Sequence, residues 1–186
     1  ENNGASYEVL FETPNVNDWI ECIEISRSNP DVIYISTRNN SLTEGLIYKS
    51  TDGGKSFNPT ANPIGTNGAQ RRVHRIAVSA TDENEIYLAL RSGGKSNKVF
   101  RSKDGGNTWV NLSTKTIEDA SLSDICLQYG TQGGIYIAAD DGKIFYRNDQ
   151  MSDWQSYNEG LGINHFTRSL RPFYRDGILL SGSNMG

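Results

Sequence analysis

The sequence predicts an all-β protein built from repeated antiparallel units, and three observations support this class. First, a phrase occurs twice, 52 residues apart: residues 50–57 are S-T-D-G-G-K-S-F and residues 102–109 are S-K-D-G-G-N-T-W. Second, a short apolar run with a central tyrosine recurs at Tyr34, Tyr87 and Tyr136. Third, clusters of Gly, Asn, Asp and Ser separate the apolar runs, as they separate strands. A fixed period of this length is typical of a repeat architecture.

Four strands, A to D in chain order, are expected in each unit. Aromatic and β-branched residues dominate the runs, which favours strands over helices. Strand A is expected at residues 22–25, 75–78 and 124–127, strand B at 30–36, 83–89 and 132–138, and strand C at 46–48 and 99–100, with the repeated phrase as the C–D turn. In the third unit, residues 146–154 keep the closing Trp154 but lack the glycines, so a looser turn is expected there.

Both ends of the chain are expected to lie inside a unit. Residues 7–11 would be strand D of a preceding unit, and residues 166–170 and 177–181 would be strands A and B of a fourth. This gives about fifteen strands in all.

The repeated phrase has a structural explanation. An Asp carboxylate accepts bonds from backbone N–H groups just downstream, glycine supplies a positive φ, and Ser fixes the turn from the other side. The closing aromatic side chain returns under the hairpin as an apolar plug. Because both units repeat the same residues, we expect them to be structural and assign no catalytic residue. They are Ser50, Asp52, Gly54, Ser56, Phe57, Ser102, Asp104, Gly106, Thr108 and Trp109, with Trp154 in the third copy.

The phrase resembles the Asp-box, or BNR, repeat of β-propellers in sialidases, sortilin-type receptors and secreted xyloglucanases. This resemblance implies that residues 1–186 are one propeller segment of about three and a half to four blades. Closed propellers have ~4–8 blades, so we expect a piece of a larger propeller with ~6–8 blades; a four-bladed closure with a shared last blade stays open. The blade repeats would be residues 19–57, 73–109 and 122–154, with residues 1–18 ending a preceding blade and 163–186 starting a further one.

Composition narrows the class of protein further. A net charge of −4 and a pI near 5.2 argue against a nucleic-acid partner, which usually leaves a basic footprint. No apolar run reaches the ~20 residues of a membrane span. Cys22 and Cys126 fall on strands A of blades two units apart, so we expect two free, largely buried thiols. The chain begins with Glu1, so a processed or truncated start is expected.

A ligand is expected on the face opposite the repeated phrase. In a meander, the A–B and C–D turns share one face, and the B–C and D–A connections form the other, where loops on a rigid scaffold carry function. The mixture of arginines, acids and a tryptophan there suits sugars or polar peptides, and the alternative is an ordinary solvated surface. The candidate residues are Trp19, Glu21, Arg38, Arg71, Arg72, His74, Arg75 and Asp124.

Other chemistry finds no support in the sequence. His74 and His165 make no metal-ligand spacing, and no cofactor is expected. Asp140 and Asp141 precede Gly142 between two apolar runs, which predicts a hairpin turn.

Three functions remain open. The first is a non-catalytic segment of a secreted protein that binds a polysaccharide, another glycan or a protein, and that packs against the remainder of its parent propeller. Residues 154–162 and 171–177 resemble closing repeats of large secreted propeller proteins of Bacteroidetes-type bacteria, which implies a bacterial, extracellular or periplasmic location.

The second is a fragment of a glycoside hydrolase, which needs two carboxylates ~5–9.5 Å apart. If the chain resembles a xyloglucanase, the two carboxylates would come from two separate propellers. If it resembles a sialidase, the site would need an arginine cluster, but the register places no three arginines together. A sortilin-like peptide receptor also fits the repeat, although the cysteine-rich module of that family is absent.

Overall fold

The computed structural model describes residues 6–39, 45–63, 72–91, 94–159, 166–173 and 178–183. These residues form antiparallel sheets in which consecutive strands pair. The first sheet contains β1 (Trp19–Ile25), β2 (Ile33–Arg38), β3 (Ile47–Ser50) and β4 (Asn58–Pro59). The second contains β5 (Val73–Val78), β6 (Ile86–Leu90), β7 (Val99–Ser102) and β8 (Val110–Asn111).

The third sheet contains β9 (Leu122–Leu127), β10 (Ile135–Ala139), β11 (Ile144–Arg147) and β12 (Gln155–Ser156), and the fourth has two strands, β13 (Thr167–Phe173) and β14 (Ile178–Ser183). One turn of 3₁₀ helix (Lys115–Ile117) precedes β9. The predicted strands A, B and C are confirmed, whereas each strand D is only two residues long.

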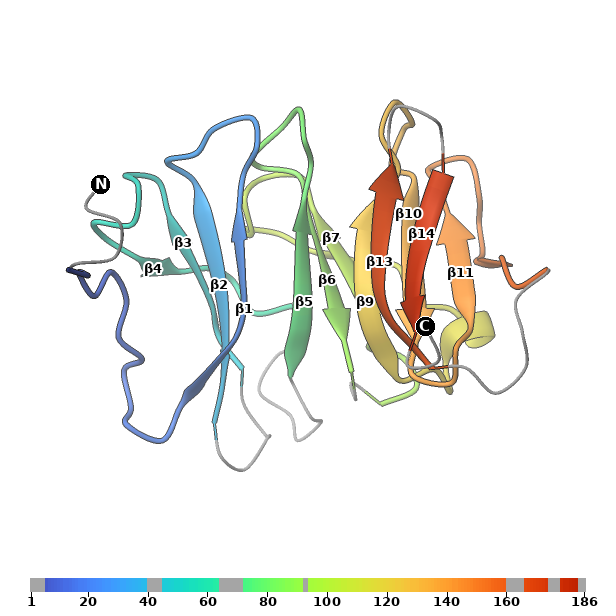
Figure 1. Ribbon diagram of the computed structural model, residues 1–186, viewed down its shortest axis with the longest axis horizontal. Coiled ribbons are helices and arrows are strands. Elements are labelled where there is room, and N and C mark those ends of the chain that lie inside the picture. The colour runs from blue at the N-terminus through green and yellow to red at the C-terminus, as the bar shows by residue number, and fades with distance from the viewer. Residues whose placement is uncertain are drawn as a thin grey trace.

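The sheets stand side by side as a fan (Figure 1). The first strand of each sheet lies next to the first strand of the following sheet, so that β1, β5, β9 and β13 form a continuous inner row. The short strands β4, β8 and β12 form the other edge of their sheets. Four-stranded meanders arranged radially around their first strands define a segment of a β-propeller.

Apolar cores lie between neighbouring sheets. Tyr34 of β2 packs in one cluster with Ile76 and Leu88 of the second sheet. Tyr87 of β6 packs in the next cluster with Ile125 of the third sheet. Because an interior sheet is covered on both faces, its second strand is buried along its whole length, which explains the near-continuous apolar runs in the sequence.

Every inner strand carries a β-bulge at the same position. The pairing register skips one residue in β1, β5, β9 and β13, at Glu21, His74, Ser123 and Arg168 respectively. A bulge bends its strand and redirects a side chain. This repeated irregularity places Glu21 and His74 at the same level of neighbouring sheets.

The N-terminal stretch differs from the prediction. The structure has fourteen strands in the described residues, because residues 7–11 form no strand. Instead, the ring of Phe11 lies against the first sheet, with its centroid 5.1 Å from that of Tyr48 and 5.1 Å from that of Phe57. The segment therefore covers part of one face of that sheet without pairing with it.

Candidate functional site

The first repeated turn is closed by its own side chains. Asp52 Oδ1 accepts hydrogen bonds from Ser56 N (2.9 Å) and Ser50 Oγ (2.8 Å), and Oδ2 accepts one from Ser56 Oγ (2.6 Å). Ser50 Oγ in turn accepts a bond from Gly54 N at 2.9 Å, at a φ of 90° that favours glycine. Hydrogen bonds from Ser56 and Ser50 lower the pKa of Asp52 to about 2.

The second turn repeats this geometry. Asp104 accepts bonds from Thr108 N (2.8 Å), Thr108 Oγ1 (2.6 Å) and Ser102 Oγ (2.7 Å), and Gly106 N donates to Ser102 Oγ at 2.8 Å. Hydrogen bonds from Thr108 and Ser102 lower the pKa of Asp104 to about 2. A carboxyl group with so low a pKa has no proton to donate near neutral pH, so the two aspartates have the properties of turn-closing groups.

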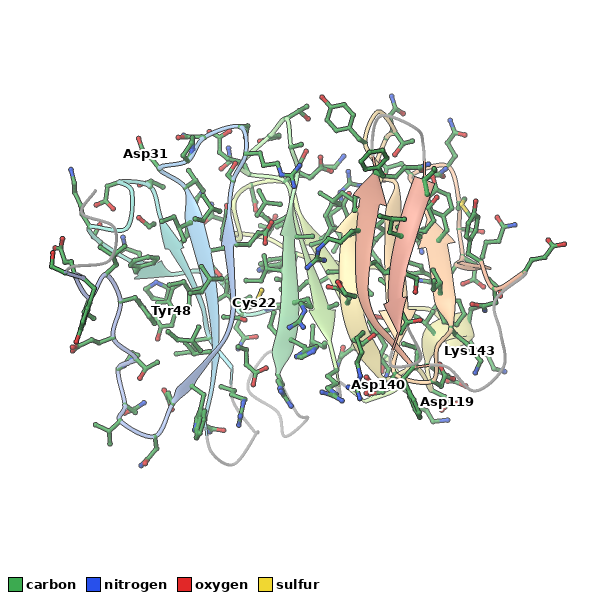
Figure 2. The ribbon with its side chains drawn as sticks, in the orientation of Figure 1. Cys22, Asp31, Tyr48, Asp119, Asp140 and Lys143 are labelled. Atoms are coloured by element: carbon green, nitrogen blue, oxygen red, sulfur yellow. The ribbon has the colours of Figure 1, made fainter. Side chains whose placement is uncertain are left out.

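Each C–D turn is tied to the A–B turn of the same sheet. Gly53 N donates to Asp31 O at 3.0 Å, Gly105 N to Asn84 O at 2.9 Å, and Asp149 N to Gln132 O at 3.0 Å. The third turn keeps this link although it lacks the glycines of the other two. The A–B and C–D turns therefore share one face, on which Figure 2 labels Asp31.

The closing tryptophans connect neighbouring sheets. Trp109 Nε1 donates to Ala61 O at 2.9 Å, and Trp154 Nε1 donates to Leu112 O at 2.8 Å, in each case on the chain that leaves the preceding sheet. Trp154 is buried, and Trp109 is partly buried. Each of the two indole rings therefore joins its own turn to the chain that leaves the preceding sheet.

Five predicted ligand-face residues come together at the opposite face; we call them the Glu21 cluster: Trp19, Glu21, Arg38, Arg72 and His74. Glu21 forms ion pairs with Arg38 and with Arg72 (2.9 Å), its Oε2 lies 3.4 Å from His74 Nδ1, and its side chain is 6% exposed. The guanidinium of Arg38 lies 5.2 Å from the ring centroid of Trp19, a cation–π contact. Arg71 lies outside the described residues.

Electrostatics fix the protonation states in the Glu21 cluster. Burial alone would raise the pKa of Glu21, but Arg72, His74 and Arg38 outweigh it and lower the pKa. Burial and the charge of Arg75 lower the pKa of His74. At neutral pH the cluster therefore holds an anionic glutamate between two guanidinium groups and a neutral imidazole.

The other two predicted residues, Arg75 and Asp124, form a second group with Arg171. Asp124 Oδ1 lies 3.4 Å from Arg75 Nε, and Oδ2 lies 3.2 Å from Arg171 Nη1. Asp124 Oδ2 also accepts a hydrogen bond from Leu170 N at 2.8 Å. The buried carboxylate thus links the inner strands of three consecutive sheets.

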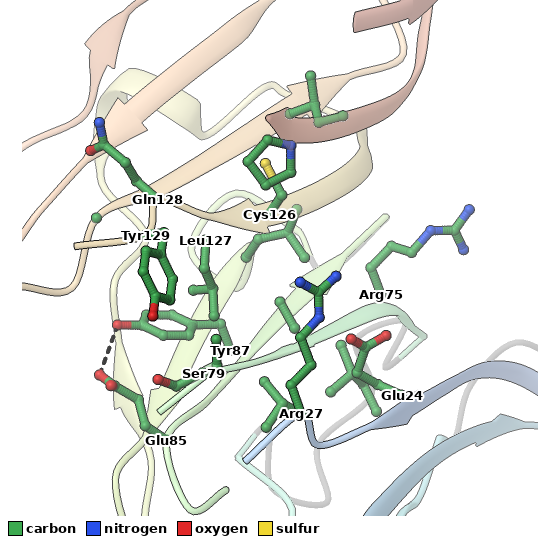
Figure 3. Close-up of a pocket in the computed structure, with 18 of the residues that line it drawn as sticks. Glu24, Arg27, Arg75, Ser79, Glu85, Tyr87, Cys126, Leu127, Gln128 and Tyr129 are labelled. Carbon is green, nitrogen blue, oxygen red and sulfur yellow. Dashed lines mark hydrogen bonds between the residues drawn. The ribbon is translucent and has the colours of Figure 1, made fainter. Parts of the chain in front are cut away.

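A hollow of about 660 Å³ runs along the inner strands and extends to the A–B turns (Figure 3). Polar groups dominate its wall: Glu24, Arg27, Arg75, Asp124, Gln128 and Arg171. Tyr129 lies beside it with 58% of its surface exposed. Burial raises the pKa of Glu24, and the charges of Arg27 and Arg171 oppose this rise.

The hollow differs from the predicted site in two respects. It extends toward the A–B turns, the face that carries the C–D turns, whereas a site was predicted at the B–C and D–A connections. It also brings together Arg27, Arg75 and Arg171, although the register suggested no group of three arginines. The sequence missed Glu24, Arg27, Tyr129 and Arg171 because only the curvature of the fan brings inner strands together across one space.

Ionised pairs also occupy the predicted hairpin after β10. Asp140 Oδ2 lies 2.9 Å from Arg91 Nη2 and accepts a bond from Ser121 Oγ at 2.9 Å. Asp141 pairs with Lys143 at 2.6 Å, and Gly142 adopts a φ of 88°. The chain therefore turns at the predicted hairpin, and both carboxylates have partners in the structure (Figure 2 labels Asp140 and Lys143).

Both cysteines carry free thiols, Cys22 half-buried and Cys126 buried, and burial raises the pKa of each, that of Cys126 to about 12. In the parts of the chain that the structure describes, no His, Cys, Asp and Glu side chains gather as a metal-binding group. None of the helices in those parts has the length and hydropathy of a membrane span.

Comparison with known proteins supports the propeller fold and finds xyloglucanases among the similar proteins. No family model matches the chain. A xyloglucanase from Paenibacillus sp is 29% identical over 126 residues, which cover 62% of this chain and 12% of that protein. The chain thus spans about an eighth of the length of this relative.

Solved structures show the same architecture. The GH74 xyloglucanase from Xanthomonas campestris superposes with a TM-score of 0.67 at 14% identity, over 88% of this chain and 26% of that one. YCF48 bound to D1 peptide superposes with a TM-score of 0.60 at 17% identity, over 90% of this chain and 49% of that one. At these identities the structures show that the fold is shared.

Proposed function

We propose that this chain is a polysaccharide-binding segment of a secreted bacterial propeller protein related to xyloglucanases, and that the hollow along its inner strands holds the glycan. In this proposal the turns at Asp52 and Asp104 are Asp-boxes, and residues 19–57, 73–109 and 122–154 are the blade repeats. The acidic net charge makes nucleic acid an unsuitable partner.

The chemistry of the hollow is the observation that carries this proposal. Ligand sites place a few polar groups on a shaped surface. Arg27 and Arg171 offer planar donor groups, and Glu24 offers an acceptor, to the hydroxyl groups of a sugar. The exposed ring of Tyr129 supplies an apolar face with a polar end, on which the C–H face of a pyranose ring can stack. The similarity to the Paenibacillus xyloglucanase favours a β-glucan with side chains as the ligand.

Three ion-paired acids of the described residues favour binding over catalysis. A glycosidase needs one carboxylic acid that is protonated at working pH. Arg72, His74 and Arg38 together outweigh the effect of burial and lower the pKa of Glu21, and Asp124 and Asp140 each lie in an ion pair with an arginine. These three residues are therefore assigned to positioning arginines rather than to acid catalysis.

Calorimetric titration of the chain with xyloglucan oligosaccharides tests the proposal. Tyr129→Ala is expected to weaken binding between about twofold and tenfold, since an aromatic contact contributes ~0.5–1.5 kcal/mol. Tyr7→Ala is the matched control, because Tyr7 is exposed and does not line the hollow. Absence of binding to any oligosaccharide at millimolar concentration, or equal losses in both variants, contradicts the proposal.

A second candidate function, glycoside hydrolysis, rests on the raised pKa of Glu24. A carboxyl group with a raised pKa beside an ionised one is the usual arrangement of an acid and its partner. Glu24 and Asp124 line the same hollow; burial is the main cause of the raised pKa of Glu24, and the charge of Asp124 adds to it. Release of reducing ends from xyloglucan that is lost in both Glu24→Gln and Asp124→Asn would favour this candidate over binding alone.

A further inference from the structure

The Glu21 cluster holds two guanidinium groups against one carboxylate. Arg38 and Arg72 each form an ion pair with Glu21 through Nε, and both Nε atoms are buried, whereas 22% of each arginine side chain is exposed. Within the described residues, no hydrogen bond leaves the terminal Nη groups of either arginine. Since a guanidinium has five N–H donors, most of the donors of both arginines remain available to a ligand.

The charges of the Glu21 cluster do not cancel. Near neutral pH Glu21 is ionised and His74 is neutral, so one carboxylate and two guanidinium groups leave one positive charge. This excess lies in a chain whose net charge is −4. Because charges at partly buried sites are screened less by salt than exposed ones, the excess favours an anionic ligand.

The next junction between sheets contains a balanced pair. Arg91 has the register position in the second sheet that Arg38 has in the first. It donates to Asp140 Oδ2 from both Nε (3.1 Å) and Nη2 (2.9 Å), which is one guanidinium for one carboxylate. Holding two sheets together therefore requires only one arginine and one acid, and the second arginine beside Glu21 is in excess of that requirement.

An aromatic ring borders the free donors. Trp19 pairs with Arg38 across the first sheet, its ring centroid lies 5.2 Å from the guanidinium, and the residue is 56% exposed. Arg38 lies on the same side of β2 as Ser36, whose Oγ donates to Val73 O of the second sheet at 2.9 Å. Trp19 and Arg38 therefore face the junction between the first two sheets, and contacts within the chain set the arrangement.

We propose that the Glu21 cluster is a second binding site, separate from the hollow, for an acidic sugar unit of a polysaccharide. None of its five residues lines the hollow. Arg38 and Arg72 donate to the oxyanion, as guanidinium groups do to carboxylates, while Glu21 holds both arginines in place. Trp19 stacks on the C–H face of the pyranose ring.

The ring beside the donors favours a sugar over a peptide. An acidic peptide side chain supplies an oxyanion but no flat apolar face for the indole to cover. A uronic acid and a sugar sulfate ester both combine an oxyanion with a pyranose ring. The shared chemistry is thus an anionic pyranose, and its charge comes from either a carboxylate or a sulfate.

Calorimetric titration with trigalacturonate and with a sulfated galactose disaccharide tests this site and distinguishes the two sources of charge. Arg72→Gln should weaken binding of the acidic sugar at least about tenfold, because it removes charge-assisted hydrogen bonds. Trp19→Ala should weaken it between about twofold and tenfold. Arg91→Gln is the matched control at the balanced junction and should bind as the parent chain does.

A further variant keeps the test decisive if Arg72→Gln does not fold. Arg72→Lys retains a positive charge beside Glu21, and it should still weaken binding since an ammonium group lacks paired donors. Circular dichroism verifies the fold of each variant.

Four outcomes would overturn the proposal. They are no binding of either acidic sugar at about 10 mM, equal losses in the folded Arg72 and Arg91 variants, tighter binding of an oligoglutamate peptide than of the sugars, and binding that depends on Arg171 of the hollow but not on Arg72.

Discussion

Replacing Trp154 with alanine should be among the most destabilising single changes in the chain. Its side chain is 4% exposed and packs in one cluster with Ile117 and Leu122, and its Nε1 donates to Leu112 O at 2.8 Å. Burying a tryptophan removes about 200 Å² from water, worth up to ~5 kcal/mol at ~25 cal/mol per Å². Measured losses for Trp→Ala in cores are ~3–5 kcal/mol, so we expect about 4 kcal/mol.

Two further variants separate the contributions. Trp154→Phe keeps most of the apolar contact but loses the hydrogen bond, which contributes ~0.5–1.5 kcal/mol, and a small part of the packing. The loss of unfolding free energy should therefore be less than half of that in Trp154→Ala. Trp109→Ala removes the equivalent side chain at a partly buried position and should cost less than Trp154→Ala.

Urea unfolding followed by circular dichroism, with the m-value checked for each variant, measures these differences. A loss below ~1 kcal/mol for Trp154→Ala at unchanged m would refute the assignment of Trp154 as a plug that connects two blades.

Three other outcomes follow from the structure. Asp52→Asn and Asp104→Asn should each lower the urea midpoint at pH 7. These carboxyl groups have a pKa of about 2 in the folded state, so the stability that they contribute is present above pH 3.8 and is lost as the pH falls toward 2. Near pH 2 the urea midpoints of the variants should therefore converge with that of the parent chain. Folding lowers the pKa of His74 from 6.5, so the stability of the chain should decline as the pH falls below 6.5. This decline should be smaller in His74→Gln. An identical pH profile of stability in the variant and the parent chain would contradict a buried neutral imidazole. Cys22 and Cys126 have raised pKa values, so Ellman's reagent at pH 8 should react slowly with the folded chain and should titrate two thiols in urea without reductant.

The strands could be predicted because their signals are local. The runs around Tyr87 and Tyr136 are apolar along their whole length since both faces of an interior sheet are covered. The turns at Asp52 and Asp104 could be predicted for the same reason, because every hydrogen bond that closes them joins residues two to four positions apart.

Residues 7–11 show where local signals are insufficient. The stretch alternates like a strand, yet it pairs with no neighbour in the structure, and Phe11 packs on Tyr48 and Phe57 instead. A strand forms only where a partner edge is available, and the sequence does not specify which edge lies nearby.

The arrangement of the predicted ligand-face residues could be derived only in part from the sequence, and their role in binding a ligand stays a prediction. Register placed Glu21, Arg38 and Arg72 on one face, and the structure joins them in ion pairs. The register of the sequence could not show that Arg27 and Arg171 share a hollow with Arg75, because these arginines are separated by up to three sheets along the chain.

The amino-acid sequence by itself determined the repeat, the strand order and the chemistry of the turns, because each depends on the period of the pattern and on contacts within a few residues. The tertiary structure decided which charged groups form ion pairs and where the space for a ligand lies. Those properties depend on the angle between neighbouring sheets, since it sets the distance between side chains about fifty residues apart.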